Sequence, residues 1–228
     1  MSVSAATGSA VDAVVFDLDG VLIDSEQLWD EVRRGLAARA GRPWPPQATR
    51  AMQGMSTPEW SGYLAQAVGI PGPAPELAKT VIDAMAQRYL TDLPLLPGAR
   101  EAVERLATRW PLGLASSSPR QLIDSVLASA GLTDHFQVTI STEEVAAGKP
   151  SPLVYLTAVA RLGVDPARTV AIEDSTNGLR SAAAAGLRVV AVPHPAFPPA
   201  PDALDLAAVT VKALTDVTLD LIASLANQ

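Results

Sequence analysis

The stretch VVFDLDGVLIDSE, residues 14–26, begins as a run of apolar residues and then places Asp17 and Asp19 where a strand would end. A continuous apolar run is typical of a central strand that is covered on both faces of a parallel sheet. A carboxylate buried without a partner is costly, because its ionised oxygens lose their hydration. Two carboxylates at the tip of a buried strand therefore predict that a cation or a proton offsets their charge.

Further short apolar runs recur along the chain and alternate with segments of helical length. Strands are expected at 13–17, 112–116, 138–140, 170–174 and 188–192, with a last edge strand near 207–211. The helix after the second strand is expected to start with a capping box at Ser118 and to end at Gly131. The next helix is expected to run from Ser151 to Gly163. This alternation predicts an α/β fold built on a doubly wound parallel sheet.

One long interval, residues 26–96, contains no convincing strand. It carries three or four helical patterns, including one that starts at Thr57 and one over 76–91, separated by proline-rich loops. The interval therefore predicts an α-helical cap inserted into a core. The core would consist of residues 1–25 and 97–228.

Composition excludes several classes of function. The formal net charge of -7 and a pI near 4.8 argue against nucleic-acid binding, which needs clustered Lys and Arg. The absence of cysteine excludes disulfides, thiolate nucleophiles and cysteine-ligated metals, and two histidines are too few for a multi-histidine site. Residues 1–10 resemble a short tail rather than a signal peptide, and no segment is apolar enough to span a membrane. A cytoplasmic protein is expected, as a monomer with a weak dimer as the alternative.

Polar residues collect where the expected strands end, which is where open α/β sheets bind their ligands. They are Asp17 and Asp19, Ser116 and Ser117, Lys149 in the loop after the third strand, and Glu173 and Asp174. Each residue alone has an ordinary structural interpretation as a turn, cap or surface residue. Their joint occurrence at successive strand ends predicts a single site.

The chemistry of this set favours phosphoryl transfer. An oxygen-only donor set suits Mg²⁺, which prefers carboxylates, waters and a substrate phosphate. With Lys149, the metal would form an electropositive hole for a phosphoryl group. One carboxylate could attack phosphorus to form an acyl phosphate, while another, kept partly protonated, acts as acid and then base. Ser116, the backbone N–H that follows it and Lys149 could stabilise the transferring oxygens.

Four segments, DLDGVLIDS, LASSS, GKP and IEDSTNG, in this order and spacing, resemble the four motifs of the haloacid dehalogenase superfamily. Within it, the chain is similar to the phosphatase and β-phosphoglucomutase-like subgroup with a helical cap after the first strand. The resemblance covers about residues 11–212. It implies a Rossmann-like core whose strand order is 5-4-1-2-3, with the nucleophile strand at the centre.

The resemblance also implies a role for each motif residue. Asp17 would be the nucleophile and Asp19 the general acid/base. Ser116, Ser117 and Lys149 would bind the phosphoryl group. Mg²⁺ would be held by Asp17, the backbone carbonyl of Asp19 and Asp174, with Glu173 as a further ligand or as a neighbour that orients Asp174.

Departures from the family pattern narrow the expected reaction. The dehalogenating members lack the second aspartate, which is present here as Asp19. The similar mutases carry a histidine where this chain has Trp29, an arginine near the position of Thr57, and a Lys-Asn pair where Pro119 and Arg120 stand. Hydrolysis is therefore favoured over mutase chemistry. The phosphonate-cleaving relatives need a cap lysine that forms a Schiff base. The only lysine of the expected cap, Lys79, is expected on a helix face, so that reaction is not favoured.

The expected activity is that of a Mg²⁺-dependent phosphatase acting on small phosphomonoesters, with sugar phosphates as the expected class. The cap would select the leaving group through Trp29 and the loop 53–60, and Arg120 could reach a second anionic group. Trp29, Trp44, Trp60 and Tyr63 could instead be cap core, and Asp24 or Ser25 could simply cap the first cap helix. The alternatives are a β-phosphoglucomutase-like mutase and a non-catalytic phosphate-responsive protein.

Overall fold

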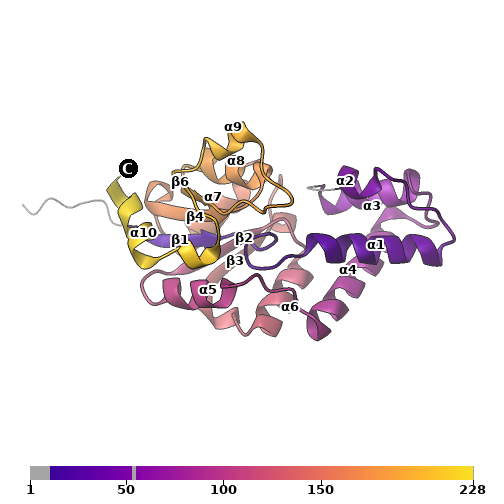
Figure 1. Ribbon diagram of the computed structural model, residues 1–228, viewed down its shortest axis with the longest axis horizontal. Coiled ribbons are helices and arrows are strands. Elements are labelled where there is room, and N and C mark those ends of the chain that lie inside the picture. The colour runs from indigo at the N-terminus through magenta and orange to yellow at the C-terminus, as the bar shows by residue number, and fades with distance from the viewer. Residues whose placement is uncertain (1–10, 53–54, 228) are drawn as a thin grey trace, which may run out of the picture.

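The computed structural model describes residues 11–52 and 55–227 of the chain (Figure 1). The expected N-terminal tail, residues 1–10, and two residues of the expected 53–60 loop, Gln53 and Gly54, lie outside the described residues. Among the helices of the described part, none is both long enough and apolar enough to cross a membrane.

The centre of the fold is a six-stranded sheet in which every pair of neighbours is parallel. Its strands are β1 (Ala13–Phe16), β2 (Leu112–Ser116), β3 (Phe136–Ser141), β4 (Thr169–Glu173), β5 (Arg188–Ala191) and β6 (Val209–Thr210). They follow the order β3-β2-β1-β4-β5-β6, with β1 between β2 and β4. This confirms the predicted fold and strand order, with the expected edge strand present as β6.

Helices cover both faces of the sheet, as an all-parallel sheet requires. These helices are α5 (Ala99–Ala107), α6 (Arg120–Ala130), α7 (Leu153–Leu162), α8 (Thr176–Ala184), α9 (Pro201–Leu204) and α10 (Leu219–Ser224). Alternate residues of β1 point to opposite faces. Val14 and Phe16 belong to one buried cluster with α5, α6 and α10, whereas Val15 belongs to another with α7 and α8. Figure 1 shows α7 and α8 above the strands and α5 and α6 below them.

The helix ends follow the glycines that the sequence indicates, but one expected start is wrong. Gly131 and Gly163 end α6 and α7 with φ angles of 65° and 71°, a conformation that glycine adopts without steric cost. The capping box expected at Ser118 is absent, because no side chain caps α6 and the Ser118 hydroxyl bonds elsewhere.

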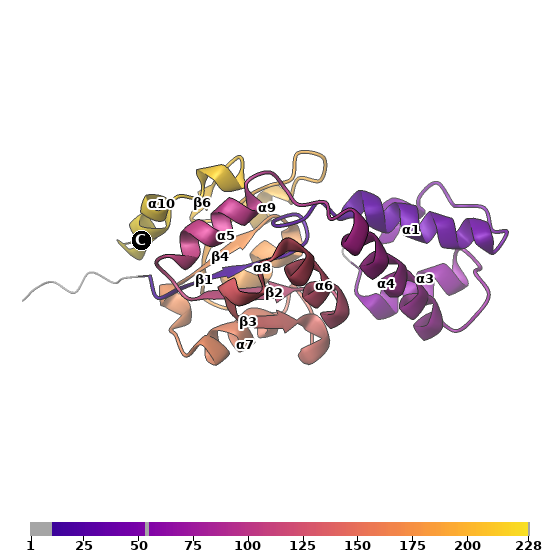
Figure 2. The same cartoon turned by 90° about the horizontal axis from the view of Figure 1, so that it is seen from below.

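Four further helices lie between β1 and α5 in the chain, and we call them the cap helices. They are α1 (Glu26–Arg39), α2 (Ala48–Met52), α3 (Thr57–Gln66) and α4 (Ala74–Thr91). Figures 1 and 2 show them gathered at one end of the sheet, beyond the point where β1 ends. Their packing residues include Leu64 of α3 and Val81 and Met85 of α4, all fully buried.

Two chain segments join the cap helices to the sheet region, and they are hydrogen-bonded to each other. The Asp24 N–H donates to the Pro94 carbonyl over 2.8 Å, and the Leu96 N–H donates to the Leu22 carbonyl over 3.0 Å. Ile23 and Leu95 form an antiparallel bridge between these bonds. We call this pair of segments, residues 22–24 and 94–96, the connecting ribbon.

Candidate active site

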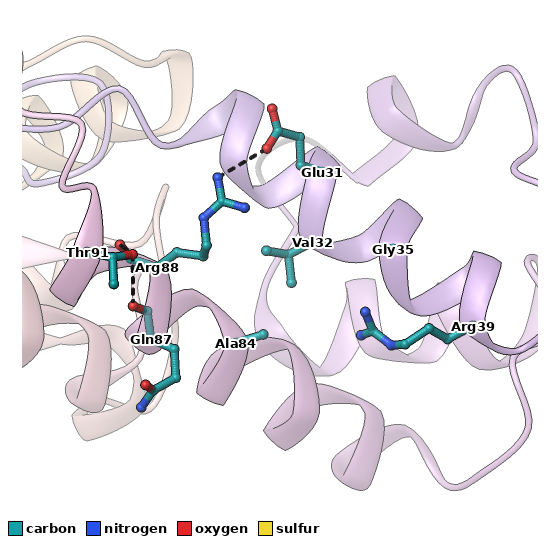
Figure 3. Close-up of a pocket in the computed structure, with 8 residues that line it drawn as sticks. All are labelled: Glu31, Val32, Gly35, Arg39, Ala84, Gln87, Arg88 and Thr91. Atoms are coloured by element: carbon teal, nitrogen blue, oxygen red, sulfur yellow. Dashed lines mark hydrogen bonds and ion pairs between the residues drawn. The ribbon is translucent and has the colours of Figure 1, made fainter.

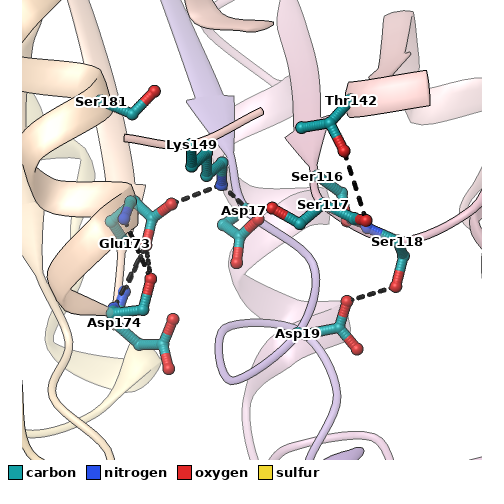
Figure 4. A network of polar contacts seen from close by, with 12 residues as sticks. Asp17, Asp19, Ser116, Ser117, Ser118, Thr142, Lys149, Glu173, Asp174 and Ser181 are labelled. Carbon is teal, nitrogen blue, oxygen red and sulfur yellow. Dashed lines mark hydrogen bonds and ion pairs between the residues drawn. The ribbon is translucent and has the colours of Figure 1, made fainter. Parts of the chain in front are cut away.

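The sequence-predicted residues meet at the carboxyl edge of the sheet (Figure 4). Asp17 directly follows β1, and its N–H donates to the Ile172 carbonyl of β4 over 3.0 Å, so the first carboxylate is fixed by the sheet itself. Glu173 is the last residue of β4 and Asp174 comes next. Because β1 and β4 are neighbours, the three carboxylates are brought together from two strand ends.

Lys149 joins two of these carboxylates. Its Nζ lies 2.7 Å from Asp17 Oδ1 and 2.5 Å from Glu173 Oε1, and its side chain is only 4% exposed. Burial disfavours the charged amine, but the two carboxylates outweigh burial and raise the pKa of Lys149 above its ordinary value. Lys149 is therefore a permanent positive charge at this site.

Glu173 accepts hydrogen bonds on both of its oxygens. Oε1 accepts from the hydroxyl of Tyr155 over 2.9 Å as well as from Lys149. Oε2 accepts from the N–H groups of Asp174 and Ser175 and from the Ser175 hydroxyl, at 3.0 to 3.2 Å. The carboxylate thus fixes both the lysine and the loop that carries Asp174. Tyr155 was not among the sequence-predicted site residues, because a tyrosine in the apolar helix α7 resembles an ordinary core residue.

Two glycines let the backbone approach the carboxylates. A Cβ at Gly178 would stand 1.9 Å from the Glu173 carboxyl group, and a Cβ at Gly20 would stand 2.0 Å from Asp174 Oδ2. Gly20 also has a φ of 79°, which disfavours any residue with a side chain. The glycine of the first motif therefore makes room for the acid of the fourth.

The three carboxylates fit a hard cation. Single oxygens of Asp17, Glu173 and Asp174 lie within 4.8 Å of one another. Asp174 Oδ1 is buried and has no hydrogen-bond partner among the described residues. Burial raises the pKa of Asp17 to about 7, with Lys149 opposing the shift, and burial also raises that of Asp174 well above its usual value. A divalent cation would supply the missing partner and favour the ionised forms.

Asp19 is held by two hydroxyl groups. Ser25 donates to Oδ1 over 2.5 Å and Ser118 donates to Oδ2 over 2.6 Å. Ser25 precedes α1 but makes no capping hydrogen bond with its side chain, so the expected role of Ser25 as a cap is wrong, like that of Ser118. Asp24, the other expected cap, instead lies 3.7 Å from His194 Nε2.

The two serines of the second motif lie in different environments. The Ser116 hydroxyl is fully buried and accepts a hydrogen bond from the Ser118 N–H over 2.9 Å. Ser117 is exposed and lines the cavity above the carboxylates. Its carbonyl accepts a hydrogen bond from the Thr142 hydroxyl over 3.4 Å.

A crevice of about 1180 Å³ separates the carboxyl edge of the sheet from the cap helices. Asp17, Asp19, Lys149 and Asp174 line its floor. On the cap side it is lined by Glu26, Trp29, Arg33, Thr57 and Trp60. Trp29 and Trp60 are both buried, and their ring centres lie 5.8 Å apart, so they serve as cap core and crevice wall at once.

The loop between β5 and α9 also lines the crevice. His194 and Phe197 are stacked with ring centres 5.3 Å apart, and both contribute to the crevice wall. The loop begins where β5 ends, so it lies at the same edge of the sheet as the carboxylates. Because open α/β sheets bind ligands at this edge, the sequence could have predicted that this loop lines the site.

Other expected contributors lie elsewhere. Arg120 does not line the crevice: its guanidinium bonds Glu144, Asp124 and the carbonyl and hydroxyl of Thr139. The suggestion that it reaches a second anionic group is therefore wrong. Lys79 pairs with Asp83 on the surface of α4, as expected of a helix-face residue.

Comparisons with known proteins agree with the motifs and the fold. A family model described as haloacid dehalogenase-like hydrolase matches residues 11–186. The chain is 38% identical over 212 residues to hexitol phosphatase B of Escherichia coli strain K12, an alignment that spans 90% of this chain and 94% of that protein. It is 34% identical over 186 residues to the phosphorylated carbohydrates phosphatase of Thermotoga maritima, spanning 81% and 86%.

A solved structure shares the whole architecture. The haloacid dehalogenase family hydrolase of Deinococcus radiodurans R1, solved with bound phosphate and sodium, superposes with a TM-score of 0.71 at 29% identity, covering 95% of this chain and 98% of that one. The motifs, the strand order and the sequence identity over most of the chain all indicate the same family. The chain belongs to the haloacid dehalogenase-like hydrolases.

Proposed function

We propose that this hydrolase is a Mg²⁺-dependent phosphatase that acts on small phosphomonoesters, with sugar phosphates as the substrate class. The observation that carries the proposal is the placement of Lys149 between Asp17 and Glu173, beside the unpartnered buried oxygen of Asp174. The names of the two relatives, a hexitol phosphatase and a phosphatase of phosphorylated carbohydrates, support the same class.

In the proposed first step, a carboxylate oxygen of Asp17 attacks phosphorus. A bond forms between Asp17 and phosphorus, the bond from phosphorus to the leaving oxygen breaks, and Asp19 gives that oxygen a proton. In the second step, Asp19 takes a proton from a water molecule that attacks the phosphoaspartate. The water oxygen bonds to phosphorus, the bond between Asp17 and phosphorus breaks, inorganic phosphate leaves, and both aspartates return to their starting forms.

The cation site would consist of the Asp17 and Asp174 carboxylates and the backbone carbonyl of Asp19. Bound Mg²⁺ would offset the negative charge of the carboxylates and of the phosphoryl oxygens. We assign Glu173 a positioning role, because both of its oxygens already accept hydrogen bonds from protein donors.

The remaining residues of the core would stabilise the transferred group. Lys149 would face the phosphoryl oxygens with a positive charge, and Ser116, Ser117 and the backbone after them would donate hydrogen bonds. Ser25 and Ser118 would hold the Asp19 carboxyl group in place for proton transfer.

We infer that residues 26–96 act as a cap on a core formed by 1–25 and 97–228. The crevice lies between the two, so approach of the cap helices would remove water from the phosphoaspartate and select the leaving group. Trp29 stands where the similar mutases carry a histidine, which supports hydrolysis over mutase chemistry. The cytoplasmic location and the monomeric state stay predictions.

The test is phosphate release from a panel of sugar phosphates, polyol phosphates and a nitrophenyl phosphate, with Mg²⁺ or with EDTA. Asp17→Asn is expected to abolish turnover, whereas Asp205→Asn, at an exposed aspartate outside the crevice, is expected to match the wild type. Absence of Mg²⁺-dependent release by the wild type would contradict the proposed function. Phosphate transfer between sugar phosphates faster than hydrolysis would instead support the mutase.

A further inference from the structure

Arg33 of α1 is a buried cation without a polar partner. Its side chain lies in the crevice wall, it is 8% exposed, and its Nε atom is buried with no hydrogen bond. The centre of its guanidinium group lies 4.7 Å from the ring centre of Trp29 and 4.9 Å from that of Trp60. Within residues 11–52 and 55–227, no hydrogen bond or ion pair to Arg33 is formed.

This arrangement costs stability unless something else uses the guanidinium donors. A guanidinium group carries five N–H donors, and burying even one of them without a partner, as at Nε here, is unfavourable. Contact with two indole rings offsets part of this cost. Burial nevertheless lowers the pKa of Arg33 to about 10, even though the charges of Glu26 and Asp30 oppose the shift. A ligand in the crevice would give these donors acceptors.

Glu26 lies on the same face of α1 as Arg33. The two residues are two helical turns apart on α1, and both line the crevice. Glu26 is half-buried, and none of the hydrogen bonds found among the described residues ends on its carboxylate. Burial, and then the charge of Asp19, raise the pKa of Glu26, with Arg33 opposing. One wall of the crevice therefore presents unpaired donors next to unpaired acceptors.

A neutral group rich in hydroxyls matches this wall better than a second anion does. Each hydroxyl donates one hydrogen bond and accepts others, so a group with several hydroxyls can donate to Glu26 and accept from Arg33. A second phosphate or carboxylate would gain from Arg33 but would be repelled by Glu26. We propose that Glu26 and Arg33 form a subsite that binds the hydroxyl groups of the leaving group, so that the preferred substrates are monophosphates of sugars or polyols and bisphosphates are disfavoured. This inference rests on the proposed function and names its specificity residues.

A second cavity of the cap region provides a matched control. It has a volume of about 450 Å³ and lies between α1 and α4, where Arg88 contacts Glu31 over 3.4 Å (Figure 3). None of the proposed catalytic residues lines it. Arg88→Met and Glu31→Gln therefore remove one positive and one negative charge from the cap helices, as Arg33→Met and Glu26→Gln do, at positions that do not line the crevice.

The experiment compares Arg33→Met and Glu26→Gln with these controls on three substrates: a hexitol monophosphate, a hexose bisphosphate and a nitrophenyl phosphate. For each crevice variant, the ratio of kcat/KM for the hexitol monophosphate to that for the nitrophenyl phosphate is expected to fall at least about tenfold, since the nitrophenyl group has no hydroxyls to lose. Glu26→Gln is also expected to lower the KM for the bisphosphate, because it removes the repulsion. Arg88→Met and Glu31→Gln are expected to keep the wild-type ratios.

Equal losses on the hexitol and nitrophenyl substrates, together with a lower Tm, would show that Arg33 has only a structural role and would overturn the inference. A wild type that prefers the bisphosphate would overturn it as well. A failure of the proposed function would be seen separately, as absence of turnover by the wild type. Calorimetric binding of the hexitol monophosphate to Asp17→Asn, with and without Arg33→Met, tests the subsite even in that case, and equal affinities would contradict it.

Discussion

The floor and the cap side of the crevice are built in opposite ways. On the floor, Lys149, Glu173 and Tyr155 bond one another and Asp17 before substrate arrives, and the buried oxygen left without a partner, Asp174 Oδ1, belongs to the proposed cation site. On the cap side, Arg33 has a buried Nε without a hydrogen bond. The floor is therefore pre-organised for one reaction, whereas the cap side keeps its hydrogen-bonding groups for the part of the substrate that varies.

This difference predicts that substitutions on the floor and in the cap helices have different consequences. On the floor, one change should disturb several partners and affect stability and turnover together. In the cap helices, the same chemical change should stay local. Most of the following predictions therefore pair a residue at or beside the floor with a residue of similar type in the cap helices.

The largest effect is expected for Lys149→Met. Its removal leaves two buried carboxylates facing each other, which should lower the free energy of unfolding by about 3 kcal/mol and turnover at least about a thousand-fold. Lys79→Met, at an exposed pair on α4, should change neither. Chemical denaturation measures the free energy of unfolding, and phosphate release measures turnover. Equal losses in Lys149→Met and Lys79→Met would contradict the prediction.

The loss of stability in Lys149→Met should also depend on pH. In the folded protein, burial raises the pKa of Asp17 from 3.8 to about 7, so the folded state binds more protons than the unfolded state and stability falls as pH rises through this window. Lys149 lowers the pKa of Asp17 and so limits this fall. The variant should therefore lose more stability at pH 8 than at pH 5, and an equal loss at both would contradict the assignment.

A smaller effect is expected for Asp174→Asn. It removes the carboxylate with the unpartnered oxygen, and the Mg²⁺ concentration needed for half-maximal turnover should rise by about tenfold to a hundredfold. Glu59→Gln, at an exposed acid of α3 in the crevice wall, should leave that concentration unchanged. Magnesium titrations followed by turnover and by calorimetry check the prediction. An unchanged magnesium requirement in Asp174→Asn would exclude Asp174 as a ligand.

Substituting alanine for glycine should have opposite effects in the two regions. Gly178→Ala places a Cβ against the Glu173 carboxyl group and should cost about 1–3 kcal/mol of stability. At Gly62, within α3, a Cβ would meet nothing within 4 Å, so Gly62→Ala should stabilise the protein by about 0.5–1 kcal/mol. Thermal and chemical unfolding measure the change in stability of both variants. A stabilising Gly178→Ala would show that the residues around Glu173 can rearrange.

The smallest effect is expected for Ser118→Ala. Loss of one of the two hydroxyl donors should leave Asp19 less well oriented and lower kcat by about tenfold, with KM little changed. Ser61→Ala, at a buried serine of α3 whose hydroxyl bonds only the Pro58 carbonyl, should leave kcat unchanged. Equal kcat values for the two variants would show that Ser118 does not position Asp19.

The sequence predicts the floor of the crevice better than its cap side, for physical reasons. Apolar runs that end in acids mark β1 and β4, and parallel pairing then brings their ends together without further information. The roles of Ser25 and Ser118 could not be predicted, because a serine just before a helix has the spacing of an N-cap. Only the fold shows that both hydroxyls bond Asp19 instead of the helix N–H groups. A charged residue such as Arg33 normally indicates a solvated helix face, and its contact with two tryptophans depends on how α1 and α3 pack.

The connecting ribbon has a mechanical consequence. A single flexible linker would let the cap helices twist, slide and tilt relative to the sheet. Two segments that are hydrogen-bonded to each other form a two-stranded ribbon. Such a ribbon should bend more easily than it twists or lets one segment slide along the other. In the proposed closure, bending of the ribbon would bring the wall that carries Glu26 and Arg33 toward the floor along one path. Every opening and closing cycle would thus return the leaving group to the same position above Asp17, with little need for a search at each turnover.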